Sequence, residues 1–278
     1  MRFIRLALVA LILAVASSTV PVSAASYSTD QSDLYWADPP SSENGWGFQI
    51  VQRGSTIFIT MFVYGPPAVP GSAGTPIWYV ATMTPSPPGS FVWSGDLYVT
   101  TGPWFGAVPY NPALFMLRKV GTMTWAPNSV STGVLSYTVD GVAVAKNAIR
   151  QTLVIENYSG HFGGAIHQTT TFCANPAFNG TLENVGVINI VQSGTAFTLT
   201  AAAATGVSCA YSGTVSQSGQ MGSVLGSFSC SDGSRGSFNA FEMQITEISV
   251  TGRFTASYTV PAACQATGWF GGLTVTTI

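Results

Sequence analysis

The chain contains two histidines, His161 and His167. Their positions determine whether the chain could bind a metal ion through imidazole ligands or form a catalytic triad. A two-residue hairpin turn at Gly163-Gly164 would put the two rings on opposite faces of the hairpin. One continuous strand would instead hold them roughly 20 Å apart. Neither arrangement lets them share a metal ion. No G-x-S-x-G nucleophile elbow accompanies them, so we expect strand histidines that face solvent or are hydrogen-bonded.

Acidic residues in apolar settings are the second source of chemistry, because glycoside hydrolysis needs two carboxyl groups roughly 5 to 9 Å apart. The candidates are Asp38, Glu43, Asp96 and Glu242. Each has a structural interpretation: Asp38 precedes a proline in a turn, Glu43 caps the corner at residues 45–47, and Glu242 pairs with Arg253 of the next strand. The sequence therefore predicts no catalytic residue, no metal site and no cofactor.

Four cysteines lie in the second half of the chain, at Cys173, Cys209, Cys230 and Cys264. No C-x-x-C pair occurs, which disfavours a zinc site. Three disulfide pairings are possible. We favour the nested one, Cys209 with Cys230 and Cys173 with Cys264. The two closed loops would contribute about 3 and about 4 to 5 kcal/mol by chain entropy.

Aromatic side chains offer a binding function instead of catalysis, because their flat faces stack on sugars or on apolar ligands. The candidate binding residues are Trp104, Phe105, Tyr110, Trp46 and Trp78. The first three share a proline-rich loop, the kind of segment that binds when a rigid sheet supports it. Alternatively, the loop rings cap a barrel end, and Trp46, Trp78 and Trp93 fill a barrel core from inward positions.

The N-terminus has the three zones of a secretory signal peptide: Arg2 and Arg5, an apolar run from Leu6 to Ala16, and the small residues Val22-Ser23-Ala24. We expect cleavage after Ala24 and a secreted or periplasmic location. Because no later segment is long and uncharged enough to span a membrane as a helix, we expect no transmembrane helix in the mature chain.

Charge and composition narrow the partners of the mature chain. Removing two arginines from nine basic residues leaves seven against 11 acidic ones, a net charge of about −4. That balance does not favour nucleic acid. A 46% hydrophobic content is ample for a core, so the chain is not disordered.

Short runs rich in Val, Ile, Thr, Phe and Tyr recur between turn residues, which predicts an all-β fold. The expected strands are Gly47 to Gln52, Thr56 to Tyr64, Pro76 to Met83, Phe91 to Thr100, Val120 to Trp125, Thr132 to Val139, Val142 to Leu153, Gly163 to Phe172, Thr181 to Gln192, Ala196 to Ala202, Ser208 to Ser216, Gly222 to Ser229, Gly236 to Ile245, Ile248 to Tyr258 and Gly268 to Thr277. Asp140-Gly141 and Asp232-Gly233 favour two-residue type I′ hairpin turns.

An internal sequence similarity predicts two tandem antiparallel modules, each a meander or a small barrel. A duplication is the hypothesis that explains this similarity. Ile50-Val51-Gln52-Arg53-Gly54-Ser55 returns 140 residues later as Ile190-Val191-Gln192-Ser193-Gly194-Thr195. Residues 93–97 resemble 211–215, and an Asp-Gly pair follows in each half. We expect a signal peptide over 1–24, a Trp-rich first module over 30–155 and a disulfide-bearing second module over 156–278.

Part of the first module resembles a family of secreted proteobacterial β proteins. Those proteins read W-x-N-P-x-E-x-G-W-G and later G-x-P-x-W-Y. Here the matching segments are Trp36-Ala37-Asp38-Pro39, Glu43-Asn44-Gly45-Trp46-Gly47 and Gly74-Thr75-Pro76-Ile77-Trp78-Tyr79. Asp38 replaces the usual Asn, and two extra residues precede Glu43. The resemblance spans residues 36–155 and implies a bacterial, exported β module. The family has no assigned activity, so it supplies no catalytic residues.

These features favour a secreted, non-catalytic β protein that binds a glycan or a small apolar ligand, with a glycan or a surface protein as the expected partner. A structural or envelope-associated protein is the alternative, and a hydrolase with an unrecognised site is the third. A membrane-embedded β-barrel ranks last of these four hypotheses, because no continuous aromatic girdle is evident in the sequence.

Overall fold

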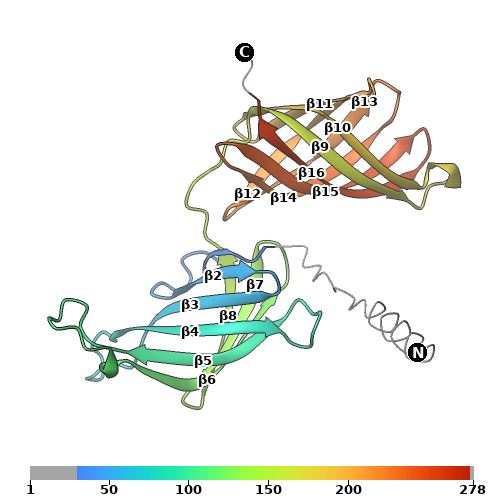
Figure 1. The fold of residues 1–278 in the computed structure, drawn as a ribbon. Coiled ribbons are helices and arrows are strands. Elements are labelled where there is room, and N and C mark those ends of the chain that lie inside the picture. Colours follow the sequence, from blue (N-terminus) through green and yellow to red (C-terminus); the bar gives the residue numbers. More distant parts are fainter. Residues whose placement is uncertain (1–29, 276–278) are drawn as a thin grey trace, which may run out of the picture.

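The computed structural model describes residues 30–275 and arranges them in two closed barrels of eight antiparallel strands each (Figure 1). The predicted all-β fold with two tandem antiparallel modules is confirmed, and each module is a barrel. The predicted signal peptide, residues 1–24, lies outside the described residues, as do Thr276 and Thr277 of the last predicted strand. No helix in the described part of the chain has the length and apolar character to cross a bilayer.

In the first barrel every strand pairs with its neighbour in sequence, and β1 closes the barrel against β8. Its strands are β1 (Asp33–Ala37), β2 (Gly47–Arg53), β3 (Thr56–Tyr64), β4 (Pro76–Pro85), β5 (Trp93–Thr101), β6 (Met116–Pro127), β7 (Thr132–Val139) and β8 (Val142–Arg150). A 3₁₀ turn, η1 (Pro112–Leu114), interrupts the β5–β6 connection.

The second barrel repeats this up-and-down order, with β9 pairing to both β10 and β16. Its strands are β9 (Gly160–Thr171), β10 (Gly180–Ser193), β11 (Ala196–Ala203), β12 (Ser208–Ser218), β13 (Met221–Cys230), β14 (Arg235–Ile245), β15 (Ser249–Val260) and β16 (Cys264–Thr274), with η2 (Pro176–Phe178) between β9 and β10. Residues 151–159 connect the barrels, and the expected module boundary after Ile155 falls in this connection.

The predicted strand positions are largely confirmed, and the differences have local causes. The bounds of β3 and β7 agree with the prediction, whereas β1 was not predicted at all. A five-residue strand carries too little alternation to stand out, and its stability comes from the pairing with β2 and β8. Gly163-Gly164 lies within β9, so this segment is one continuous strand, the second of the two alternatives.

Period-two alternation builds both cores, because every second side chain of a barrel strand points inward. The first core is large and aromatic: Trp93 and Trp125 are fully buried, together with Tyr35 and Phe48. The indole Nε1 of Trp93 donates to the Ser55 carbonyl at 2.9 Å, so burial leaves its polar atom satisfied. The second core contains no buried tryptophan among the described residues and relies on Phe, Val, Met and Ala.

The repeated hairpin occupies equivalent places in the two barrels, β2–β3 and β10–β11. Gly54 and Gly194 adopt φ of 57° and 59°, and the glutamine two residues before each glycine donates Nε2 to the glycine carbonyl at 3.0 and 3.1 Å. The second pair of similar segments does not occupy equivalent strands. Residues 93–97 lie in the fifth strand of the first barrel, and residues 211–215 lie in the fourth strand of the second barrel. Duplication therefore stays a hypothesis that rests on the similarity of residues 50–55 and 190–195.

The two Asp-Gly turns differ from each other. Asp140 and Gly141 both have positive φ, 48° and 87°, as a type I′ turn requires. The same prediction for Asp232-Gly233 is wrong: residues 231–234 form a four-residue loop in which only the glycine has positive φ. Asp232 accepts from the Ser234 backbone N–H at 2.9 Å, which stabilises the longer loop.

Both predicted disulfides are present, Cys209–Cys230 and Cys173–Cys264. The first joins directly paired residues of β12 and β13, and the second ties the end of the β9 segment to the start of β16. Both lie in the second barrel, as expected. Two intact disulfides fit a protein that folds in an oxidising compartment.

The turn between β12 and β13 contacts the end of the first barrel. Asp33 accepts from the guanidinium of buried Arg150 at 3.1 Å and from the Gln220 backbone N–H at 3.0 Å. Gly219 donates its N–H to the Thr152 hydroxyl at 2.9 Å. The Asp33 carboxylate therefore links the two barrels, and Gly219 joins the same turn to the connection between them.

Candidate functional site

The interior of the second barrel contains an apolar cavity of about 100 Å³. Its lining is dominated by inward aliphatic and aromatic side chains, namely Ile166, Phe197, Leu199, Tyr211, Phe228, Phe238, Met243, Phe254 and Phe270. Concave, mostly apolar sites with a few polar groups are the usual form of a small-molecule site. We call this space the lumen cavity.

Small residues at inward positions create the lumen cavity. Gly164 and Gly186 pair with each other on β9 and β10, and Ala240 and Ala256 face inward from β14 and β15. The first barrel has the fully buried indoles of Trp93 and Trp125 in its core, whereas no tryptophan is buried in the described part of the second barrel. Eight strands enclose an interior that is just wide enough for side chains, so glycine and alanine leave space for a ligand.

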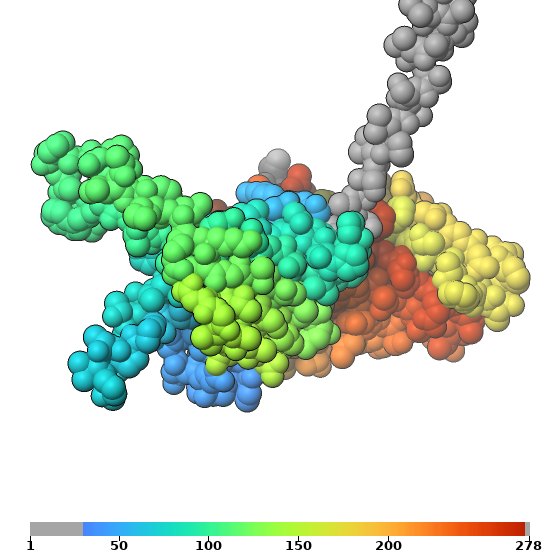
Figure 2. All heavy atoms as spheres, turned by 90° about the horizontal axis from the view of Figure 1, so that it is seen from below, coloured from blue at the N-terminus to red at the C-terminus, as the bar shows by residue number. Residues whose placement is uncertain are grey.

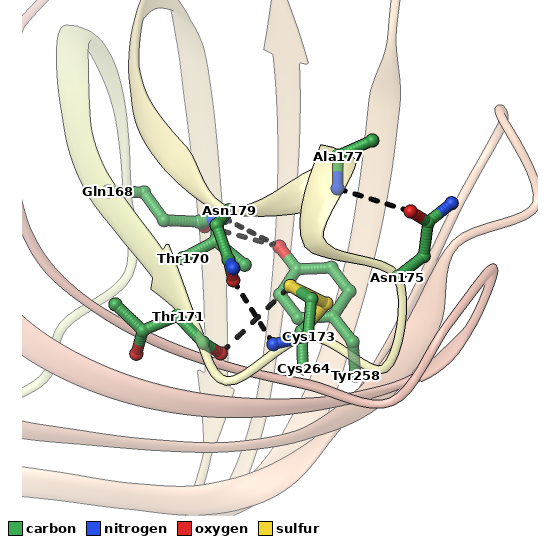
Figure 3. Close-up of a disulfide and its surroundings, with 9 residues drawn as sticks. All are labelled: Gln168, Thr170, Thr171, Cys173, Asn175, Ala177, Asn179, Tyr258 and Cys264. Atoms are coloured by element: carbon green, nitrogen blue, oxygen red, sulfur yellow. Dashed lines mark hydrogen bonds between the residues drawn. A yellow bond between two sulfur atoms is a disulfide. The ribbon is translucent and has the colours of Figure 1, made fainter.

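A hydrogen-bonded polar pair, Gln168 and Tyr258, lies at one end of the lumen cavity. Gln168 Nε2 donates to the Tyr258 hydroxyl at 3.0 Å and lies 3.1 Å from the Thr170 hydroxyl. Figure 3 shows this pair beside the Cys173–Cys264 disulfide, which ties β9 to β16 at that end. The opposite end holds the fully buried Tyr158, whose hydroxyl donates to the Met243 carbonyl at 3.3 Å.

The cavity is electrically neutral at physiological pH. Burial raises the pKa of the Tyr211 phenol to about 12 and also raises the pKa of Tyr258. None of the described residues that line the cavity is acidic, basic or a histidine. An ion would therefore lose its hydration without gaining a partner, so the site fits only an uncharged ligand.

The tryptophans expected to bind or to fill the core have three different fates. Trp93 is buried, as the core-filling alternative expects, but Trp78 is 57% exposed, so that alternative is wrong for it. Trp46 is half-buried and donates Nε1 to Glu43 at 3.2 Å. Trp46 and Trp78 come together on one shallow groove of about 300 Å³ beside Tyr64.

The loop candidates form a separate group. Trp104, Phe105 and Tyr110 lie in the β5–β6 connection, and the rings of Trp104 and Phe105 are 5.7 Å apart. All three are largely exposed, so they project from the barrel instead of capping it. The five predicted binding residues thus belong to two surfaces of the first barrel, and none lines the lumen cavity.

Three of the four acidic residues considered for catalysis are engaged in ion pairs. Glu43 pairs with Lys146, whose hydrogen bond lowers the pKa of that carboxyl, and Asp96 pairs with Lys119 at 2.7 Å. The predicted Glu242–Arg253 pair is present at 3.5 Å. Within residues 30–275, no group of three or more His, Cys, Asp and Glu side chains could hold a metal ion.

The two histidines lie on one strand, six residues apart, and both point away from the buried Phe162 and Gln168 side of β9. His167 stacks on Trp269 with ring centroids 3.9 Å apart and hydrogen-bonds Glu183 at 2.9 Å. It is the hydrogen-bonded strand histidine that the sequence predicts.

The lumen cavity was not predicted from the sequence, because the candidate binding residues were chosen among the aromatic residues of the first half, where most tryptophans lie. The signal was the pairing of an aromatic residue with a small one two positions later, Phe238 with Ala240 and Phe254 with Ala256. Both members of each pair face inward, and the second leaves the space.

Comparison with known proteins adds little. No protein-family model and no curated protein matches the chain. Among solved structures, the chain is similar to a protein of Bacteroides fragilis NCTC 9343 described as a putative outer membrane protein, at 14% identity and a TM-score of 0.30. The alignment covers 82% of this chain and 88% of that one. A TM-score this low carries no argument about function, and the family resemblance of residues 36–155 stays a prediction.

Proposed function

We propose that the chain is an exported, non-catalytic binding protein whose second barrel holds a small, uncharged, mainly apolar molecule. The observation that carries this proposal is the lumen cavity, with its mainly apolar lining and a few polar groups, the Gln168–Tyr258 pair and Asn184 among them. The two disulfides and the predicted signal peptide support the exported location.

Size and polarity define the ligand class. Apolar cavities of roughly 150 Å³ stay dry and bind benzene. A cavity of about 100 Å³ suits a single small ring or a short alkyl chain. Gln168 and Tyr258 can exchange their mutual hydrogen bond for one to a ligand hydroxyl or carbonyl, so one polar substituent fits at that end.

Cavity filling tests the proposal directly. Ala240→Leu adds a branched chain to a buried inward position and should abolish binding of fluorobenzene. Binding to the wild type is measured as broadening of the ¹⁹F line of fluorobenzene and as a rise in the Tm of the protein. Ligand at 100 times its Kd stabilises the folded state by about 2.7 kcal/mol. The matched control is Ala210→Leu, the same change at an exposed position of the same barrel.

The two variants separate the outcomes. Broadening in the wild type and in Ala210→Leu, but not in Ala240→Leu, is the expected result. Equal broadening in all three would place fluorobenzene elsewhere, and no broadening in the wild type would remove the proposal. In that case an envelope-associated structural role, the alternative predicted from the sequence, becomes the better account.

A further inference from the structure

The most exposed apolar side chains of the first barrel gather on the loop of residues 102–115. Phe105 is 89% exposed and Val108 96%, and Trp104, Tyr110 and Phe115 are each more than half exposed. Figure 2 shows this loop (green) and the 65–75 loop (cyan) as two projections from the end of the molecule away from the second barrel. Exposed apolar surface of this extent marks an interaction site.

Neither loop carries a charged residue. Between Arg53 and Arg118 the only charged side chain in the chain is Asp96, which lies in β5 and pairs with Lys119 at 2.7 Å. Arg118 pairs with Asp140 at 2.6 Å on the barrel wall. The charges nearest the loop are thus neutralised in pairs at its base, and its tip is uncharged over 14 residues.

The 102–115 loop is ordered before it meets a partner. Ala107 donates its N–H to the Trp104 carbonyl at 3.0 Å, and the Asn111 side chain accepts from the Ala113 N–H at 3.1 Å. The Trp104 indole packs over Gly106, where any Cβ would lie within 2.6 Å of the ring. The aromatic side chains are therefore held outward, and binding orders little additional chain.

These features select a lipid bilayer over a glycan or a protein. A glycan is normally held by several polar side chains beside the rings. In this loop the Asn111 side chain caps the 3₁₀ turn, so the Trp104 indole N–H and the Tyr110 hydroxyl are the polar side-chain groups that remain. A protein partner needs a continuous complementary surface, whereas two separate projections present only convex tips. A fluid bilayer needs no matching shape, and Trp and Tyr are the residues that favour its interface.

We infer that the 102–115 loop, assisted by the 65–75 loop, inserts into the interfacial layer of a lipid membrane and attaches the protein to it peripherally. Insertion of uncharged side chains depends on the hydrophobic effect. Binding should therefore need no anionic lipid and should resist salt.

Vesicle flotation of the full mature chain tests this inference. The probe is a vesicle of phosphatidylcholine and phosphatidylethanolamine, both zwitterionic. The double variant Phe105→Ser/Val108→Ser should lower the partition coefficient at least about tenfold, because two exposed apolar side chains no longer enter the membrane. The control Phe172→Ser/Leu225→Ser removes comparable exposed apolar surface from the second barrel and should float like the wild type.

A second readout does not depend on the folding of that variant. Brominated phosphatidylcholine should quench part of the tryptophan emission of the wild type. In Trp104→Phe, which keeps an apolar ring, flotation should persist while that part of the quenching disappears.

Several results would overturn the inference: no flotation of the wild type, flotation of the loop variant equal to the wild type, quenching unchanged in Trp104→Phe, or flotation that needs anionic lipid and is lost in salt. Dimerisation that the loop variant abolishes, without vesicle binding, would assign the surface to a second copy of the chain.

Discussion

At the scale of the residue, the two barrels differ in how their interiors are filled. Trp125 is fully buried in the first barrel and donates Nε1 to the Gln31 side chain at 3.0 Å. It also packs edge-on against Tyr35 and Phe48, with ring centroids 5.0 and 5.3 Å away. A large residue thus fills interior volume in the first barrel, whereas the second barrel has Ala240 and Ala256 at inward positions that line a cavity.

Truncation of this indole should therefore be costly. Trp125→Ala should lower the free energy of unfolding of the first barrel by about 3 to 5 kcal/mol, through lost burial and a cavity that the closed sheet cannot collapse. Trp78→Ala, at an exposed position, is the control and should cost less than about 1 kcal/mol. Urea unfolding measures both, and equal costs would contradict the assignment of Trp125 to the core.

The lumen phenol gives a prediction on pH. Burial raises the pKa of Tyr211 from 10.0 to about 12, so between these values the folded state holds a proton that the unfolded state has released. Stability from this group is complete below pH 10 and falls as pH rises toward 12. Tyr211→Phe should flatten that alkaline loss of stability. The difference in phenolate absorbance between the wild type and Tyr211→Phe isolates this phenol among the ten tyrosines, and a difference that titrates at the ordinary tyrosine pKa in folded protein would show an open, wet cavity instead.

At the scale of the element, alternation and turn chemistry predicted most strands, because both are local. The Gly54 and Gly194 turns follow from sequence alone, since a left-handed residue is needed and glycine supplies it. The bulge in β14 does not: Glu242 adopts φ of 53°, and register shifts between Phe241 and Gln244. The sequence predicts the Glu242–Arg253 pair, which is present, but not the bulge in which Glu242 lies, because a register shift depends on how β14 and β15 pair along their whole length.

The site was less predictable than the strands for the same reason. Trp104, Phe105 and Tyr110 stood out because large aromatic residues in a proline-rich loop are visible locally. The lumen cavity is a missing volume, the difference between a closed ring of strands and the side chains within it. That difference appears only after the register of β9 to β16 is known.

The repeated turn offers a test at this scale. Gly54→Ala places a Cβ in open space but on a left-handed backbone, so strain alone should cost about 1 kcal/mol. Gly102→Ala is the control: its Cβ is equally free and its φ is not positive, so stability should stay the same or rise by up to about 1 kcal/mol. Chemical denaturation compares them, and a harmless Gly54→Ala would argue against the observed turn geometry.

At the scale of the whole molecule, one small contact area joins two separately closed barrels. Each core is continuous within its own barrel, whereas the junction depends on Asp33, Gly219, Gln220 and Thr152. Interfaces of this kind within a chain generally allow relative motion. The two proposed activities lie apart, with the lumen cavity in one barrel and the projecting loops at the far end of the other.

Loss of the junction should therefore leave both barrels folded. A Cβ at Gly219 would lie 2.1 Å from the Asp33 carboxylate, so Gly219→Val should separate the barrels. Proteolysis within residues 151–159 should accelerate, while fluorobenzene binding persists. Gly206→Val is the control, because it carries the same left-handed backbone at a turn where the Cβ contacts nothing. Equal cleavage of both variants would mean that the junction does not order the connection.

The most direct test of the ligand-binding account is a crystal of the mature chain soaked with bromobenzene and measured for anomalous scattering from bromine. We expect one strong peak inside the second barrel, among Phe238, Met243 and Phe254, and none inside the first. An empty second lumen beside a bound molecule elsewhere on the surface would contradict it.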